Sequence, residues 1–139
     1  MATSALLEKP KHYPISTQEY LRMGEAGVFP PEARLELIDG DIVEMAPIGS
    51  IHASVVNTVA ALLIRAVPSQ AAVSVQNPIV LGEKSVPQPD LAVLKARSDR
   101  YKTEHPRVED VLLVIEVSDS TLDYDLTTKV RLYAEAGIV

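Results

Sequence analysis

The segment VLLVIEVS, residues Val111–Ser118, constrains the fold more than any other part of the sequence. Seven of its eight residues are aliphatic or small, which is typical of a strand buried on both faces of a sheet. The eighth is Glu116, a carboxylate that such a strand does not bury without a partner. The sequence therefore predicts a layered fold around this strand and a second group that meets the charge of Glu116.

The composition is that of one globular domain. The chain has 139 residues, is 47% hydrophobic, contains no cysteine and has a net charge of −6. No apolar run approaches the roughly 20 residues of a membrane helix, and the N-terminal apolar stretch is too short for a signal peptide. We therefore expect a cytoplasmic protein with no membrane association, no disulfides and no thiolate metal site. Residues 1–14 are expected to be a loose arm and residues 15–139 a single domain.

One basic segment interrupts the acidic chain. Residues 95–107, KARSDRYKTEHPR, contain five basic and two acidic residues, a net charge of +3, so the rest of the chain carries −9. The overall charge argues against a general nucleic-acid coat protein. The segment is either a solvated surface loop or a phosphate clamp for nucleic acid. In the second case the binding residues are Lys95, Arg97, Arg100, Lys102 and Arg107.

Start and stop signals predict the order of elements. A helix follows the capping box Ser16-x-x-Glu19, and a hairpin turns at Asp39-Gly40. A helix capped by Ser50 then runs to about residue 67. Strands follow at 73–81, 90–94 and 111–117, and a last helix at 123–136 is closed by a glycine. This order predicts an α/β or α+β fold with a mixed β-sheet flanked by helices.

The last helix carries a lysine on its apolar side. Lys129 lies in the middle of the apolar arc, and Asp125 lies at its edge, one turn earlier. The other residues of that arc are Leu126, Val130, Leu132, Tyr133 and Ala136. Lys129 either forms an ordinary surface pair with Asp125 or meets a buried negative charge, and we favour the second interpretation.

Two further polar residues share faces with apolar side chains. His52 lies in the apolar arc of the helix at 51–67, together with Val55, Val56, Val59, Leu62, Leu63 and Ala66. A lone histidine there is more often a hydrogen-bonded core residue than a ligand. Glu36 shares one face of the hairpin with Ile38, Val43 and Met45. This face is either buried or it is the solvent face of an edge hairpin.

Asp90 becomes a candidate site residue when its position is considered together with that of Glu116. If the strand at 90–94 neighbours the strand at 111–117, then Asp90, Glu116 and Ser118 share one sheet face, with Lys129 above them. Converging oxygen ligands without cysteine predict a hard cation, Mg²⁺ or Mn²⁺. Lys129 would then neutralise the charge that develops on a phosphate in the transition state.

These residues resemble a known family. Pro89-Asp90, Glu116-Val-Ser118 and the segment 124–137 with its pattern K-x-x-x-Y-A-x-A-G are similar to a restriction-endonuclease-like family, formerly classed as a domain of unknown function. That family belongs to the PD-(D/E)XK nuclease superfamily. The hairpin at 34–40 and His52 also look like the family, so the resemblance spans residues 17–139.

The resemblance implies a restriction-endonuclease-like core and metal-dependent cleavage of DNA. Asp90 and Glu116 would match the metal-binding carboxylates, and Glu36 the acidic residue near the start of the core. The superfamily's motif lysine would fall at Ser118, so Lys129 would replace it from the following helix. His52, Ser118 and Asp125 would be neighbouring or substrate contacts.

Two alternatives and one structural expectation accompany this interpretation. The leading hypothesis is a Mg²⁺-dependent endodeoxyribonuclease, and its rival is a non-cleaving nucleic-acid-binding or accessory module on the same fold, which Ser118 and the charge of −6 favour. A structural oligomerisation domain would instead require an exposed Glu116. Relatives continue past the A-G segment into another strand, so we expect the domain to lack its last strand and to present an open edge that favours a homodimer.

Overall fold

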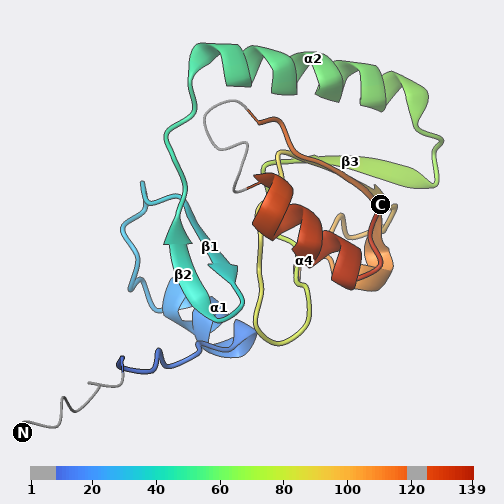
Figure 1. Ribbon diagram of the computed structural model, residues 1–139. Helices are drawn as coiled ribbons and strands as arrows, with labels where there is room; N and C mark the ends of the chain where they lie inside the picture. Colours follow the sequence, from blue (N-terminus) through green and yellow to red (C-terminus); the bar gives the residue numbers. More distant parts are fainter. Residues whose placement is uncertain (1–8, 119–124) are drawn as a thin grey trace, which may run out of the picture.

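The chain folds into an α+β structure. The computed structural model describes residues 9–118 and 125–139, except for the side chains of residues 125 and 126. Its elements, shown in Figure 1, are α1 (Thr17–Glu25), β1 (Leu35–Ile38), β2 (Asp41–Glu44), α2 (Ser50–Ala66), β3 (Ala71–Val75), β4 (Leu91–Lys95), the 3₁₀ turn η1 (Val108–Asp110), β5 (Val111–Ile115), the π-helical turn η2 (Asp125–Lys129) and α4 (Val130–Glu135). The predicted mixture of helices and strands is confirmed.

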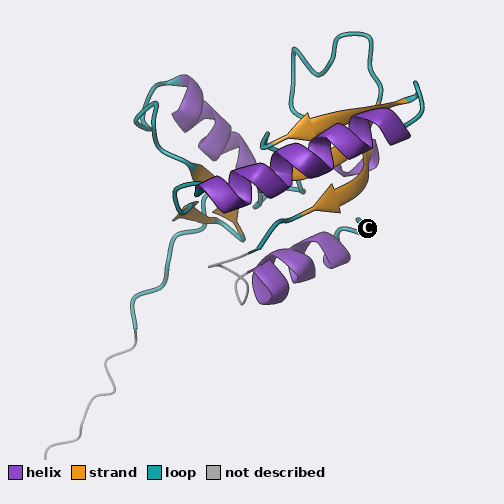
Figure 2. Ribbon diagram, turned by 90° about the horizontal axis from the view of Figure 1, so that it is seen from above, coloured by secondary structure: helices purple, strands orange, loops and turns teal. Residues whose placement is uncertain are grey.

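A three-stranded sheet lies between two helices. Its strand order is β3-β4-β5, with α2 on one face and α4 on the other (Figures 1 and 2). Both strand pairings are antiparallel. The mixed character that we expected is limited, within the described part of the chain, to an isolated parallel bridge between Val80 and Arg107. Antiparallel pairing places the start of β4 beside the end of β5.

The N-terminal elements form as the sequence predicts. Ser16 caps α1 by accepting a hydrogen bond from the backbone N–H of Glu19 at 3.1 Å. The hairpin turns at Asp39 and Gly40, whose φ angles of 49° and 87° fit a two-residue turn. A bridge between Leu37 and Val86 attaches the hairpin to the segment before β4. This attachment brings the hairpin side chains to the sheet.

Several predicted strand and helix limits are wrong. The strand expected at 73–81 is β3, Ala71–Val75, because Gln76 has a φ of +52° and turns the chain out of the strand. Ser50 begins α2 but does not cap it, since the cap residue is Gly49. The strand expected at 111–117 ends at Ile115. It is not buried on both faces, because Leu112 is exposed and the other four residues of β5 are only partly buried.

The helix faces also differ from the wheel. In α2 the buried residues are Val56 and Ala60, whereas Val55 is exposed and Leu62 is 59% exposed. In the last helix the π turn inserts an extra residue per turn, so the regular 100° spacing fails and Val130 is exposed. The predicted start at residue 123 lies outside the described residues. Gly137, with a φ of +76°, ends the helix as expected.

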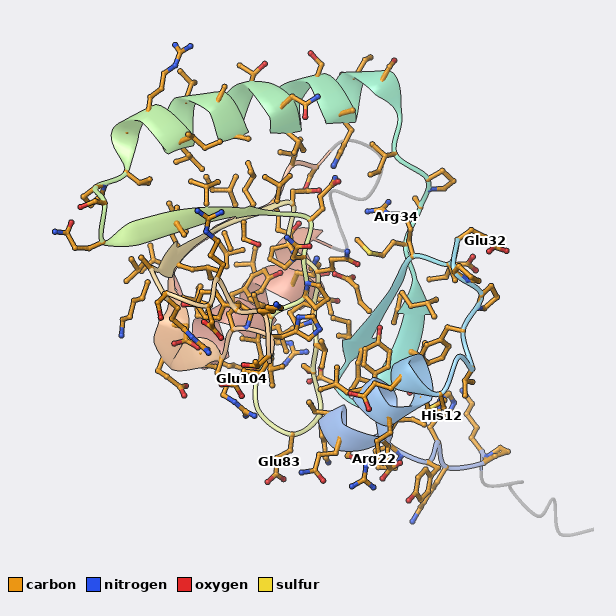
Figure 3. All side chains as sticks on the ribbon, turned by 180° about the vertical axis from the view of Figure 1, so that it is seen from behind. His12, Arg22, Glu32, Arg34, Glu83 and Glu104 are labelled. Atoms are coloured by element: carbon orange, nitrogen blue, oxygen red, sulfur yellow. The ribbon has the colours of Figure 1, made fainter. Side chains whose placement is uncertain are left out.

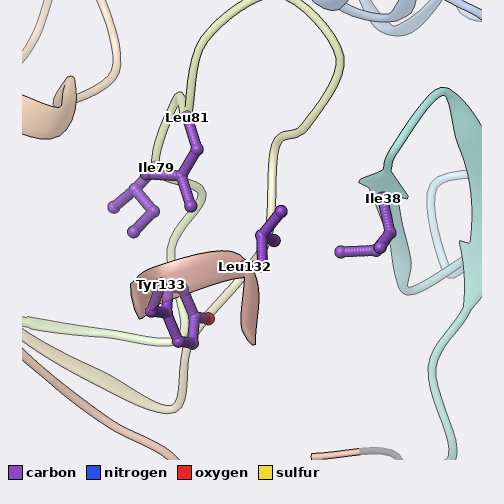
Figure 4. Packing of buried hydrophobic residues seen from close by; sticks show 5 residues of the cluster. All are labelled: Ile38, Ile79, Leu81, Leu132 and Tyr133. Atoms are coloured by element: carbon purple, nitrogen blue, oxygen red, sulfur yellow. The ribbon is translucent and has the colours of Figure 1, made fainter. Parts of the chain in front are cut away.

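Two apolar clusters form the core. One joins the hairpin to α4 and contains Ile38, Ile79, Leu81, Leu132 and Tyr133 (Figure 4). The other packs α2 on the sheet through Val56, Ala60 and Leu91. Within the described ranges, no helix has the length and apolar character needed to cross a membrane.

Candidate metal and phosphate site

Buried charged residues gather between the two clusters. Acidic residues such as Glu32, Glu83 and Glu104 lie at the surface (Figure 3). In contrast, Glu36 is 2% exposed and Asp90 is 6% exposed. Burying a carboxylate costs free energy unless it is paired or hydrogen-bonded, so their partners identify a built site.

Asp90 and Glu116 lie side by side at one end of the sheet. Asp90 directly precedes β4 and Glu116 directly follows β5, and the register pairs their neighbours Leu91 and Ile115. The backbone N–H of Val117 donates to Asp90 Oδ2 at 2.8 Å. The backbone N–H of Asp90 donates to Glu116 Oε2 at 3.4 Å. Each carboxylate is thus held by the strand end that carries the other.

Lys129 joins this pair to the hairpin. Its Nζ lies 2.7 Å from Glu36 Oε1 and 2.5 Å from Glu116 Oε1, and its side chain is 3% exposed. Burial lowers the pKa of the Lys129 ammonium, but Glu116 and Glu36 outweigh burial and the pKa is raised. Lys129 therefore meets buried negative charge and does not form the ordinary surface arrangement. The side chain of Asp125 lies outside the described residues.

Glu116 has an unusually high pKa. Burial raises it from 4.5 to about 7, and nearby Asp90 adds to the rise, although Lys129 and a hydrogen bond from Tyr133 oppose it. Tyr133 Oη donates to Glu116 Oε1 at 2.6 Å. Sequence reasoning placed Tyr133 in the apolar arc and missed this contact. Its spacing of four residues from Lys129, which puts the two on one side of a helix, was the available signal.

His52 and Gln76 reach the outer oxygen of Asp90. His52 Nε2 lies 2.8 Å from Asp90 Oδ1, so the histidine on the predicted apolar arc meets a carboxylate. Gln76 Nε2 lies 3.5 Å from the same oxygen. No sequence signal identified Gln76, because it lay inside a predicted strand. Both side chains orient Asp90 from the side of α2 and β3.

A second glutamine links Asp90 to Glu36. The backbone N–H of Gln88 donates to Glu36 Oε1 at 2.8 Å, and Gln88 Nε2 donates to the carbonyl of Gln76 at 2.6 Å. Glu36 is therefore on the buried side of the hairpin, which settles the two options that the alternation left open. Ser118 follows Glu116 by two residues and is half-buried.

The basic segment is apart from this site. It continues from Lys95, at the opposite end of β4 from Asp90. Arg97 pairs with Asp99 at 2.8 Å and with Glu104 at 3.4 Å, and Arg107 lies 4.0 Å from Glu104. Two of the five predicted phosphate-binding cations are thus partly neutralised, while Lys95, Arg100 and Lys102 are exposed.

The buried group fits a divalent cation in charge and donor type. Glu36, Asp90 and Glu116 supply three carboxylates and Lys129 one ammonium, which leaves a surplus of negative charge when all are ionised. Among the described residues, no three His, Asp or Glu side chains are grouped to hold a metal ion by themselves. Mg²⁺ is commonly bound by one or two carboxylates together with water and substrate phosphates, so Asp90 and Glu116 suffice as protein ligands.

Comparison with known proteins identifies a family. A protein-family model described as Uma2, putative restriction endonuclease, matches residues 17–139. No curated protein matches the chain.

Proposed function

Because this chain belongs to the Uma2 family, described as putative restriction endonuclease, we propose that it is a metal-dependent endodeoxyribonuclease. The reaction is hydrolysis of a DNA phosphodiester: water adds across one P–O bond and leaves a phosphomonoester and a hydroxyl. The observation that carries the proposal is a buried group of three carboxylates around one ammonium: Glu36 and Glu116 pair with Lys129, and Asp90 lies beside Glu116. One ammonium cannot neutralise three ionised carboxylates, and a divalent cation held by Asp90 and Glu116 would neutralise the remaining negative charge.

Asp90 and Glu116 would hold Mg²⁺ or Mn²⁺. When bound, such an ion supplies a Lewis acid for the phosphate and lowers the pKa of a water molecule. The chain's own residues orient the two ligands. His52 and the Val117 N–H fix Asp90, and Tyr133 fixes Glu116.

Lys129, at the start of the helix that covers the sheet, would neutralise negative charge that develops on the substrate phosphate. An ammonium has three N–H donors. Glu36 and Glu116 accept two of them, which leaves one for a substrate oxygen. Donors placed where negative charge develops stabilise the transition state, so Lys129 would take the role that a motif lysine at position 118 has elsewhere.

The test is nicking of supercoiled plasmid with Mg²⁺ or Mn²⁺. We expect wild-type protein to nick the plasmid and Asp41→Asn to nick it at the wild-type rate. Asp90→Asn should nick it at least about a hundredfold more slowly. Asp41 is a matched control because it is an exposed aspartate on β2, with one carboxylate oxygen 3.6 Å from His12 Nδ1. A parallel thermal-shift titration with Mn²⁺ should stabilise wild type and Asp41→Asn but not Asp90→Asn.

Two outcomes would contradict the proposal. Equal nicking by wild type and Asp90→Asn would mean a contaminating nuclease. DNA binding by wild type without any nicking would favour the rival, a non-cleaving accessory module on this fold. The thermal-shift arm separates the cases, since it reports metal binding without depending on cleavage.

The homodimer stays a prediction. Ile51, Val55 and Leu62 are exposed at helical spacing along α2, which supports a self-associating face. Sedimentation equilibrium over a tenfold range of protein concentration measures it.

A further inference from the structure

A pocket of about 860 Å³ lies along the edge of β3, apart from the carboxylate group. One wall is β3 itself, which pairs with β4 on its other edge. The second wall is the loop at 96–106, and Ile64 of α2 contributes the rim. The volume is in the range of small-molecule sites, roughly 300–1,000 Å³.

The lining combines an apolar floor with cations. The floor includes Val73, Leu94 and Pro106, and Arg97, Arg100 and His105 stand at the loop side. Ser74 and Asn77 add polar groups from the strand side, where Asn77 Nδ2 donates to Ser74 Oγ at 3.1 Å. Such a lining suits a ligand with a flat apolar body, a few polar edges and a negative group.

The loop is pre-shaped. Arg100 and Tyr101 have φ angles of 52° and 59°, a left-handed backbone that bulky residues seldom adopt. Asp99 holds them there: Oδ1 accepts from the Tyr101 N–H at 3.2 Å, and Oδ2 accepts from Thr103 Oγ1 at 3.2 Å. Arg97 lies 4.6 Å above the ring of Tyr101. Strained backbone held by several bonds is commonly found at ligand-binding sites.

Arg100 is the cation available to an anion. Asp99 and Glu104 occupy Arg97, whereas Arg100 is exposed and has no ion pair with any residue that the structure describes. A free guanidinium at the mouth of a pocket favours a phosphate, because its planar donors match phosphate oxygens.

The pocket and the carboxylate group share one segment of chain. Val75 and Asn77 line the pocket, and Gln76 between them turns toward Asp90. The left-handed backbone of Gln76 lets consecutive residues serve the two sites. A ligand in the pocket is therefore one residue away, along the chain, from a contact of Asp90.

We propose that this pocket binds one nucleoside phosphate unit, with its base and sugar on the apolar floor and its phosphate on Arg100. The unit comes either from an unpaired nucleotide of a DNA strand or from a free nucleotide. The first source rests on the proposed nuclease function, and the second does not.

Binding is measured without metal, in EDTA, so that cleavage plays no part. Deoxyadenosine monophosphate is titrated by calorimetry, and a fluorescein-labelled single-stranded oligonucleotide by anisotropy. We expect Arg100→Ala to weaken binding of the mononucleotide by about tenfold or more, the loss of one charge-assisted hydrogen bond. Lys84→Ala should change it less than about twofold, because Lys84 is an exposed cation that does not line the pocket.

A second pair of variants tests the pocket from the helix side. Ile64 is 63% exposed and lines the pocket, and Leu62 is 59% exposed and does not. Ile64→Glu should weaken the binding of both ligands, and Leu62→Glu should change the binding of each by less than about twofold. Binding of the mononucleotide identifies a free nucleotide as a source, and binding of the oligonucleotide alone identifies the DNA strand.

The proposal is overturned if neither ligand binds. It is also overturned if Arg100→Ala and Lys84→Ala lose equal affinity, or if Ile64→Glu and Leu62→Glu do, because surface charge alone would then explain binding. Asp90→Asn should bind both ligands like wild type. Its loss of nicking therefore tests the nuclease proposal independently of the pocket.

Discussion

At the scale of single residues, Lys129 balances the buried site. Replacing it by methionine leaves Glu36 and Glu116 without their shared cation. We expect Lys129→Met to lower the free energy of unfolding at pH 8 by about 3–5 kcal/mol, the usual cost of breaking a buried pair on one side. Urea denaturation followed by circular dichroism measures it.

Arg131 provides the control. It lies two residues further along, pairs with Asp39 and Glu135, and its side chain is 45% exposed. Arg131→Met should cost less than about 1 kcal/mol, since exposed ion pairs contribute little. Similar losses in the two variants would mean that Lys129 is not buried in solution.

Glu116 gives the apoprotein an unusual pH dependence. Its pKa in the folded state, about 7, is above the ordinary 4.5, so the folded protein binds this proton more tightly than the unfolded chain. The Glu116 contribution to the free energy of unfolding should therefore rise as pH falls from about 7 to 4.5, by on the order of 3 kcal/mol.

Denaturation in EDTA at pH 8, 7, 6 and 5 measures this dependence. Glu116→Gln cannot titrate, so the difference between wild type and this variant isolates the residue from every other carboxylate. A difference that stays constant across these pH values would show that Glu116 has an ordinary pKa.

At the scale of elements, the β1–β2 turn does not tolerate a side chain at Gly40. Gly40 has a φ of +87°, and a Cβ there would lie 2.9 Å from Pro14 Cβ. Gly40→Ala should therefore lower the free energy of unfolding by about 1–3 kcal/mol. Gly24→Ala is the control, because nothing lies within 4 Å of its added Cβ and it sits in α1.

The control variant should be stabilised by about 0.5–1 kcal/mol, the helix preference for alanine over glycine. Thermal unfolding of both proteins measures the pair. Loss of stability in Gly24→Ala as large as in Gly40→Ala would argue against turn strain as the cause.

The sequence predicts the elements better than their limits and faces. Glu36, Glu116 and Lys129 were recognisable because each interrupts an apolar pattern, and an interruption needs a partner. Asp90 was recognisable because its strand could neighbour the strand that carries Glu116. Tyr133 was missed because it fits an apolar pattern while its hydroxyl binds Glu116. The face of α2 was misjudged because apolar residues surround much of that helix, which leaves its buried side undetermined by periodicity.

Local backbone geometry accounts for the remaining differences. The left-handed Gln76 ended β3 early, and glutamine is not among the residues whose presence signals that conformation. The π turn at Asp125–Lys129 changed the phase of the last helix, and a wheel drawn at constant spacing cannot represent it.

At the scale of the whole molecule, charge limits how strongly DNA can be held. The chain carries −6 overall, and acidic partners engage Arg97 and Arg107. Lys95, Arg100 and Lys102 remain for phosphates. Each neutralised phosphate contributes about −0.9 to the slope of log affinity against log salt, so we expect a slope no steeper than about −3 for duplex DNA.

Fluorescence anisotropy between 50 and 200 mM salt, with Asp90→Asn protein in EDTA, measures that slope. Lys102→Ala should make it shallower by about 0.9. A slope unchanged by this variant would place the duplex on another surface of the molecule.

The ion pair between Glu36 and Lys129 joins residues 93 positions apart, and this separation has a consequence during translation. Glu36, Asp90 and Glu116 all leave the ribosome before Lys129, the ammonium that pairs with Glu36 and Glu116. We expect nascent chains stalled before residue 129 to be cut readily by protease. Longer stalled chains, in which α4 has left the ribosome, should resist the protease. The buried ion pair cannot form until the chain has been synthesised beyond residue 129.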